Sequence, residues 1–209
     1  MLIQLLSEGV TIDRDIIPSD SHADFLRSVV MLSDLNTWAI GTVGPQNFGV
    51  KWFAGRARPE EVAYAIKTGV IPRHHVPAKI LTALDAMTFD SATAFTAYAE
   101  GSPKHPSWPA MHSAASAGSM WMAIVMNLSP AQWCETKALD YGVAYARTVA
   151  GVHFPTDNIA GLNLGQEILA RKLPEHLAAR YGSDPRVVRE KILNMRFEWA
   201  DYLTSECFA

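Results

Sequence analysis

Apolar residues recur at helical spacing along most of this chain, whereas the alternation typical of strands is weak throughout. Several segments also have helix boundaries, such as Ser129 and Pro130 at one start and Gly151 at the following end. The segments that predict helices are 22–35, 59–69, 76–87, 89–101, 112–128, 129–151, 154–173 and 183–206. Together they predict an all-α protein, folded as a helical bundle.

One stretch interrupts this pattern. The segment 105–112 reads HPSWPAMH, with a histidine at each end and two prolines between them. Proline lacks the amide donor and biases the residue before it towards extended geometry, so regular helix is excluded up to about Pro109. We therefore expect the next helix to begin near His112, seven residues after His105.

Length and charge narrow the class of protein. With 209 residues and 22.9 kDa, the chain is expected to form a single helical domain, 1–209. A net charge of -3 gives no global basic field for nucleic acid or an anionic membrane, so any anion site must be local. The start of the chain has no basic leader pattern, which makes the cytoplasm the default location. The longest apolar stretch, 114–128, is too short to span a bilayer.

The two cysteines are too few for a disulfide framework. Cys134 is expected as a small buried hydrophobic residue and Cys207 as a residue of the C-terminal tail. An intermolecular bridge through Cys207 is left open.

Three short stretches carry candidate chemistry. KWFAGRARP places Lys51 and Arg58 seven residues apart, on one face if the segment is helical. PAMH ends at His112. In ARTVAGVHFPTD, Arg147 closes a helix and His153 lies in the connection to the next one. Each stretch alone also fits an ordinary structural role, as solvated cations or a histidine at a helix start.

His153 and Asp157 are four residues apart in the third stretch. At this spacing Asp157 would accept a hydrogen bond from one ring nitrogen of His153, which leaves the other nitrogen oriented as a nucleophile or ligand. A plain helix-capping contact is the alternative.

Taken in order, K-x6-R-P, P-x-x-H and R-x3-G-x-H-x3-D resemble the three-part signature of the vanadium-dependent haloperoxidase and type 2 phosphatidic acid phosphatase superfamily. The resemblance covers 51–165, a little over half of the chain. It implies the fold of that superfamily, with Lys51, Arg58, Arg147 and the backbone amide of Met111 holding a tetrahedral oxyanion.

The resemblance also implies roles for the histidines. His153 would coordinate vanadium or attack phosphorus, Asp157 would orient it, and His112 would be the acid–base group. The middle motif departs from the common P-S-G-H, because Ala110 lacks the serine hydroxyl and Met111 replaces glycine. Such a loss weakens oxyanion binding by about 1.5 to 3 kcal/mol.

Within the superfamily, the three stretches resemble the bromoperoxidase group, which has a second histidine seven residues before the acid–base histidine. Here that residue is His105, which would influence the halide oxidised; a surface-loop imidazole is the alternative reading. This resemblance implies vanadate as cofactor, with hydrogen peroxide, a halide and a small organic acceptor as partners and phosphate as a competing anion. A soluble acid phosphatase using the same residues, or a noncatalytic anion-binding relative, stays open. A homo-oligomer is expected, because related haloperoxidases are generally longer.

Overall fold

The computed structural model describes residues 1–87 and 102–208. Its α-helices in chain order are α1 (Leu2–Ser7), α2 (Phe25–Ala54), α3 (Pro59–Lys67), α4 (Ala78–Asp85), α5 (Met111–Ala115), α6 (Gly118–Val125), α7 (Pro130–Val149), α8 (Pro155–Tyr181) and α9 (Pro185–Met195). Short 3-10 turns are η1 (Asp20–His22), η2 (Arg73–His75) and η3 (Trp199–Thr204). The described part of the chain has no strand beyond an isolated bridge between Ile12 and Met126. The predicted all-α class is therefore confirmed, while the helix expected at 89–101 lies outside the described residues.

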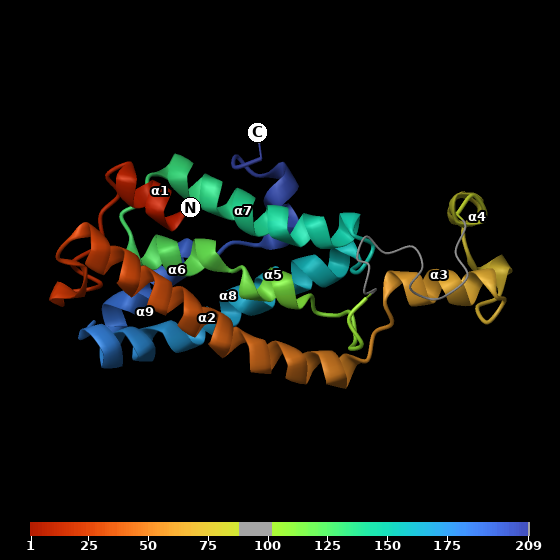
Figure 1. The fold of residues 1–209 in the computed structure, drawn as a ribbon, viewed down its shortest axis with the longest axis horizontal. Coiled ribbons are helices and arrows are strands. Elements are labelled where there is room, and N and C mark those ends of the chain that lie inside the picture. The colour runs from red at the N-terminus through yellow and green to blue at the C-terminus, as the bar shows by residue number, and fades with distance from the viewer. Residues whose placement is uncertain (88–101, 209) are drawn as a thin grey trace.

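The bundle is built around the short helix α5. This helix packs against α8, α2 and α7. In Figure 1, α5 and α8 lie between α7 on one side and α2 on the other. The main core lies nearer α6 and α9, where Leu35, Trp121 and Leu173 are all but fully buried. Helices α3 and α4 project from one end of the bundle (Figure 1). The three sequence motifs meet between this projection and the core. They lie at the ends of α2, α3, α5, α7 and α8.

Helix α2 is much longer than the predicted segment 22–35. It begins after Asp24, whose side chain accepts a hydrogen bond from the Arg27 amide, and it continues through Pro45. It ends at Gly55, which adopts a left-handed conformation with φ of 63°. Lys51 consequently lies in the last turn of α2, whereas Arg58 is the N-cap residue of α3. The segment 51–58 is not one helix, so the condition for the two side chains to share a helical face is not met.

Other helix ends also differ from the sequence pattern. The expected helix 112–128 is two helices, because the backbone at Ala117 leaves helical geometry with ψ of 45°. Helix α8 passes through Pro174 and ends at Gly182, which has φ of 77°. Helix α9 ends at Met195 because the backbone of Arg196 is extended. The chain changes direction there, and Trp199, three residues later, is buried.

The expectation for the cysteines is wrong. Cys134 and Cys207 form an intramolecular disulfide that joins the first turns of α7 to the end of the chain, across 73 residues of sequence. Sequence spacing gave no sign of the pairing, because only the fold of the last helix and η3 brings Cys207 back to α7. Among the described residues, no helix combines the length and the apolar character needed to cross a membrane.

Candidate anion site

Lys51 anchors the loop that precedes α5. Its side chain is fully buried in the last turn of α2, and its ammonium donates hydrogen bonds to the carbonyls of Pro106 (3.0 Å) and Ser107 (2.9 Å). Burial, followed by the charge of Arg58, lowers the pKa of Lys51 to about 8. The proline-rich segment is therefore held in place by a buried cation from a helix more than fifty residues earlier.

Arg58 connects that loop to the third motif. It is the N-cap residue of α3 and is 1% exposed. Its guanidinium donates to the Val152 carbonyl (2.8 Å) and lies 3.3 Å from Nε2 of His153 and 3.2 Å from Nδ1 of His105. Burial, and then the charge of Arg147, lowers the pKa of Arg58. Arg147 is itself buried in the last turn of α7, so three cations converge on one site.

His153 and Asp157 form the pair that their spacing predicted. Nδ1 of His153 lies 3.2 Å from Oδ2 of Asp157, which also accepts the Phe154 amide at 3.0 Å. With Nδ1–H donating to the carboxylate, Nε2 keeps its lone pair and points to Arg58. Burial and the charges of Arg58 and Lys51 outweigh the hydrogen bond that His153 donates to Asp157, and they lower the pKa of His153 to about 4. The imidazole is therefore neutral at neutral pH.

Arg56 is a site residue that the sequence reasoning missed. Its Nη1 donates to Oδ1 of Asp157 at 2.7 Å and to Oγ1 of Thr156 at 2.9 Å, and its guanidinium stacks over the Phe154 ring. Burial raises the pKa of Asp157, but hydrogen bonds from His153 and Phe154 and the charge of Arg56 together hold it below its usual value. The only sequence signal was a third cation within KWFAGRARP, a position that the three-part signature leaves unspecified.

The N-terminus of α5 lies directly against α8. The Ala110 amide donates to the backbone carbonyl of Asp157 at 2.9 Å. The helix begins at Met111, one residue before the start near His112 that the prolines predicted. His112 follows in the first turn. Burial, and then the charges of Lys51 and Arg58, lower the pKa of His112, so this imidazole also belongs to the cationic cluster.

His105 is part of the same cluster. Its ring packs edge-on against Phe48 with centroids 5.0 Å apart, and its Nδ1 faces Arg58. Burial is the main cause that lowers its pKa, and the charges of Arg58 and Lys51 add to the effect. The geometry therefore differs from that of a solvated loop histidine.

A hollow of about 460 Å³ opens beside this cluster. Its rim includes Trp52, Arg56, Lys104 and His105. Trp52, the sequence neighbour of Lys51, is 64% exposed and lies on this rim. The hollow thus shares His105 and Arg56 with the cluster, and its lining also includes the carboxylate of Glu61.

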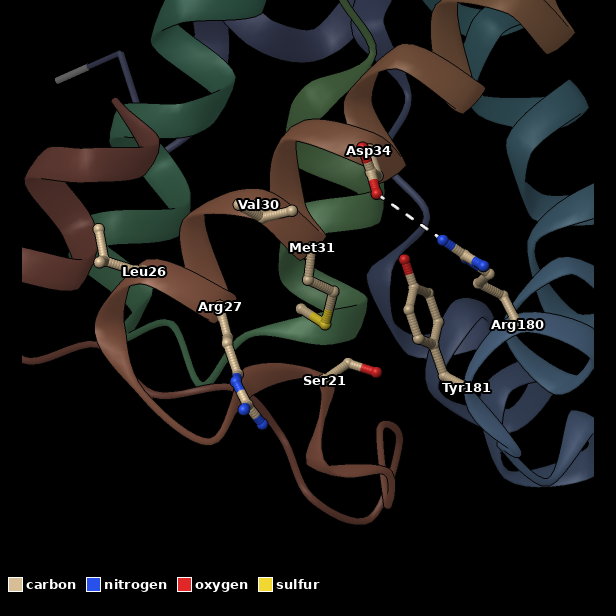
Figure 2. Close-up of a pocket in the computed structure, with 8 residues that line it drawn as sticks. All are labelled: Ser21, Leu26, Arg27, Val30, Met31, Asp34, Arg180 and Tyr181. Atoms are coloured by element: carbon tan, nitrogen blue, oxygen red, sulfur yellow. Dashed lines mark ion pairs between the residues drawn. The ribbon is translucent and has the colours of Figure 1, made fainter.

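A second hollow, of about 400 Å³, lies between the N-terminal half of α2 and the end of α8 (Figure 2). An ion pair between Asp34 and Arg180, 3.8 Å apart, crosses it. Asp34 precedes Lys51 by 17 residues of continuous helix, roughly 25 Å at 1.5 Å per residue. This hollow is therefore distinct from the anion site.

The family comparison agrees with this geometry. The model of the PAP2 superfamily matches residues 35–170, which include every residue of the cluster described above. The chain belongs to the PAP2 superfamily. Comparison with curated proteins and with solved structures gave no match.

Proposed function

We propose that this protein is a vanadate-dependent haloperoxidase, which oxidises bromide or iodide with hydrogen peroxide to hypohalous acid or halogenated organic products. The observation that carries this choice is the position of His105. This second histidine lies seven residues before His112 and contacts Arg58 inside the cluster. A phosphatase needs one acid–base histidine beside the nucleophile, whereas the bromoperoxidase-like pattern has two.

The residues fit a tetrahedral oxyanion such as vanadate. Lys51, Arg58 and Arg147 bring three buried positive charges together, and the two guanidiniums suit planar, paired contacts to anionic oxygens. The neutral Nε2 of His153 is a suitable ligand atom for a metal oxyanion. Its contact with Arg58 is long at 3.3 Å, so an incoming anion has only a weak hydrogen bond to displace. Ala110 provides no hydroxyl, which makes the site poorer in donors than the common family pattern.

Each residue then has a defined task. Vanadate, when bound, supplies a Lewis acid that polarises peroxide for attack by halide, without haem or another redox cofactor. His153, held by Asp157, would bind it, and the three cations would neutralise its oxygens. The neutral His112 imidazole would accept the proton that peroxide loses on binding and return it to the leaving oxygen. His105 would act on the halide through its position beside Arg58.

Phosphomonoester hydrolysis is the second candidate, and the same neutral His153 favours it. Its Nε2 lone pair would attack phosphorus, the three cations would stabilise the transferred group, and His112 would protonate the leaving alcohol. A noncatalytic anion binder is the third reading, motivated by the missing hydroxyl at Ala110.

Vanadate resembles both phosphate and the five-coordinate transition state of phosphoryl transfer, so vanadate binding does not distinguish these three functions. Measured turnover does. The apoprotein would be assayed with 4-nitrophenyl phosphate, and the vanadate-loaded protein with bromide, peroxide and phenol red. We expect bromination to exceed ester hydrolysis. Ester hydrolysis without bromination would establish the phosphatase. Inactivity in both assays, with weak vanadate binding that Ala110→Ser improves, would establish the binder.

Two variants test the roles proposed for His153 and His105. His153→Ala should abolish turnover, since it removes the ligand or nucleophile, whereas His105→Ala should mainly change the ratio of bromide to iodide oxidation. His74→Ala is the matched control, because His74 is exposed in η2 at the projecting end of the molecule. An unchanged halide ratio in His105→Ala would refute the role given to His105.

A further inference from the structure

Three polar side chains beside the anion cluster are joined by hydrogen bonds. The hydroxyl of Ser113 donates to Oδ1 of Asn158 at 3.0 Å, and Nδ2 of Asn158 donates to the hydroxyl of Thr148 at 2.8 Å. Ser113 is 0% exposed, Asn158 is 4% exposed and Thr148 is half-buried. Together these residues form the Asn158 network, which links α5, α8 and the end of α7 across 45 and 10 residues of sequence.

Each member of the Asn158 network directly follows one residue of the anion site in the sequence: His112, Arg147 or Asp157. Successive side chains on an α-helix point about 100° apart, because the helix has 3.6 residues per turn. The network members therefore reach neighbouring helices, while the residues before them belong to the cationic cluster. The network joins the three helices at the positions that carry these site residues.

The short helix α5 depends on this network more than the turn between α7 and α8 does. That turn is closed by its own backbone, since the Val152 and His153 amides donate to the Arg147 carbonyl at 3.2 and 3.3 Å. Helix α5 has five residues, and one backbone bond from the Ala110 amide ties its start to α8. In the part of the chain that the structure describes, the Ser113 hydroxyl makes the only side-chain hydrogen bond from α5 to another helix.

An amide side chain suits position 158. Its oxygen accepts and its nitrogen donates, so Asn158 in one orientation bonds α5 on one side and α7 on the other. An apolar residue of similar size would fill the space without imposing a direction. A carboxylate would place a second negative charge next to Asp157. Both polar atoms of the buried amide are paired, which is the condition for such a group to order its surroundings.

We propose that Asn158 is a positioning residue of the oxyanion site. Through Ser113 it fixes the direction of α5, and thereby the position of the His112 imidazole relative to the cations. Through Thr148 it fixes the end of α7, which carries Arg147. This role rests on the oxyanion site proposed above, but it is the same whether that site oxidises halide or hydrolyses a phosphate ester.

Phosphate titration of the full-length apoprotein by calorimetry tests this role. Asn158→Leu removes both hydrogen bonds and keeps a side chain of similar size, so it should weaken phosphate binding about 10-fold, as loss of a supporting partner commonly does. Thr148→Val removes one hydroxyl at a half-buried position and should weaken binding about 3-fold. The double variant should bind no more weakly than Asn158→Leu, because Thr148 acts through Asn158. Additive losses, or wild-type affinity in Thr148→Val, would contradict the role, and the second comparison holds even if Asn158→Leu does not fold.

Asn163→Leu is the matched control on the same helix. Asn163 donates to Glu198 at 2.7 Å and accepts from the Trp199 amide at 3.3 Å, so it ties α8 to the C-terminal segment and not to α5. This variant should lower the thermal midpoint as Asn158→Leu does, while the folded protein keeps its phosphate affinity. An equal loss of affinity in the control would show an effect of general stability and overturn the role of Asn158.

NMR titration of the His112 imidazole reports the position of α5 without any bound anion. Burial and the charges of Lys51 and Arg58 lower the pKa of this imidazole. Both single variants of the Asn158 network should raise that pKa towards its ordinary value, because α5 is no longer held beside the cations, and the control should not. Failure of the wild-type protein to bind phosphate would count against the oxyanion site itself. An unchanged His112 pKa in both network variants would overturn the positioning role.

Discussion

At the scale of single residues, the two oxygens of the Asp157 carboxylate contact three partners. Oδ2 orients His153 and accepts the Phe154 amide, while Oδ1 accepts from Arg56. Asp157 is 0% exposed, so these contacts replace the water that an ionised carboxylate needs. Arg56 therefore positions the carboxylate that positions the imidazole.

Arg56→Gln should weaken phosphate and vanadate binding about 10-fold and lower the free energy of unfolding by about 1–3 kcal/mol. The reason is that Asp157 loses its charged partner, while Arg56 is partly exposed and solvent moderates the cost. Phosphate titration by calorimetry, repeated across pH, measures the affinity and how far it depends on the ionisation of Asp157. Arg27→Gln is the control, because Arg27 pairs with Asp24 on the surface. Equal affinities in the two variants would contradict the positioning role.

The site could be predicted from sequence only as far as the spacing of its motifs allowed. The pairing of His153 with Asp157 followed from their separation of four residues, and the structure brings Lys51, Arg58 and Arg147 together with them. Arg56 could not be found in this way, because its contact with Asp157 spans 101 residues and depends on the turn at Gly55.

At the scale of elements, two glycines of α8 let α5 approach closely. A Cβ atom at Gly161 would overlap the Ala110 carbonyl oxygen and lie 2.9 Å from Cβ of Ser113, and one at Gly165 would overlap the Ala114 carbonyl oxygen. Backbone therefore packs on backbone at this contact. This contact sets the distance between His112 on α5 and the His153 connection.

Gly165→Ala should reduce the free energy of unfolding by about 2–4 kcal/mol, because the added methyl meets rigid backbone that cannot move aside. It should also weaken phosphate binding, since α5 shifts away from α8. Chemical denaturation measures the first effect and calorimetry the second. Gly142→Ala on α7 is the matched control: nothing lies within 4 Å of its Cβ, so the change should stabilise by about 0.5–1 kcal/mol. Equal stability of the two variants would contradict the close-packing argument.

Helix positions were more predictable than helix ends. Ser129 caps α7 as expected, accepting from the Gln132 amide while the Gln132 side chain reaches back. Pro45 and the nearby glycines concealed the second half of α2, because they disfavour helix locally and only tertiary packing compensates. The break at Ala117 likewise follows from packing, since the Gly118 and Ser119 amides bond to the buried Asp140 carboxylate of α7.

At the scale of the whole molecule, the disulfide closes a long segment of chain. The loop-closure model gives about 4 kcal/mol for a separation of 73 residues. Replacing Cys134 and Cys207 together with serine should therefore lower the free energy of unfolding by up to this amount and lower the thermal midpoint. Wild-type protein under reducing conditions should match the double variant. An unchanged midpoint in both would show that packing alone holds the C-terminal segment.

The homo-oligomer stays a prediction. Exposed apolar side chains such as Leu26, Val30 and Phe53 provide surface that a second copy would cover. Light scattering at micromolar concentration should give at least twice 22.9 kDa, and a strictly monomeric mass would contradict it. The cytoplasmic location also stays a prediction, and an intramolecular disulfide is more typical of oxidising compartments.

The central claim is that the three motifs build one oxyanion site, and a crystal structure with bound vanadate tests it most directly. We expect a single anion against Nε2 of His153, with Arg58 and Arg147 turned to its oxygens and the contact between Arg58 and His153 replaced. An anion bound elsewhere, with Arg58 still hydrogen-bonded to His153, would show that the three motifs do not form one oxyanion site.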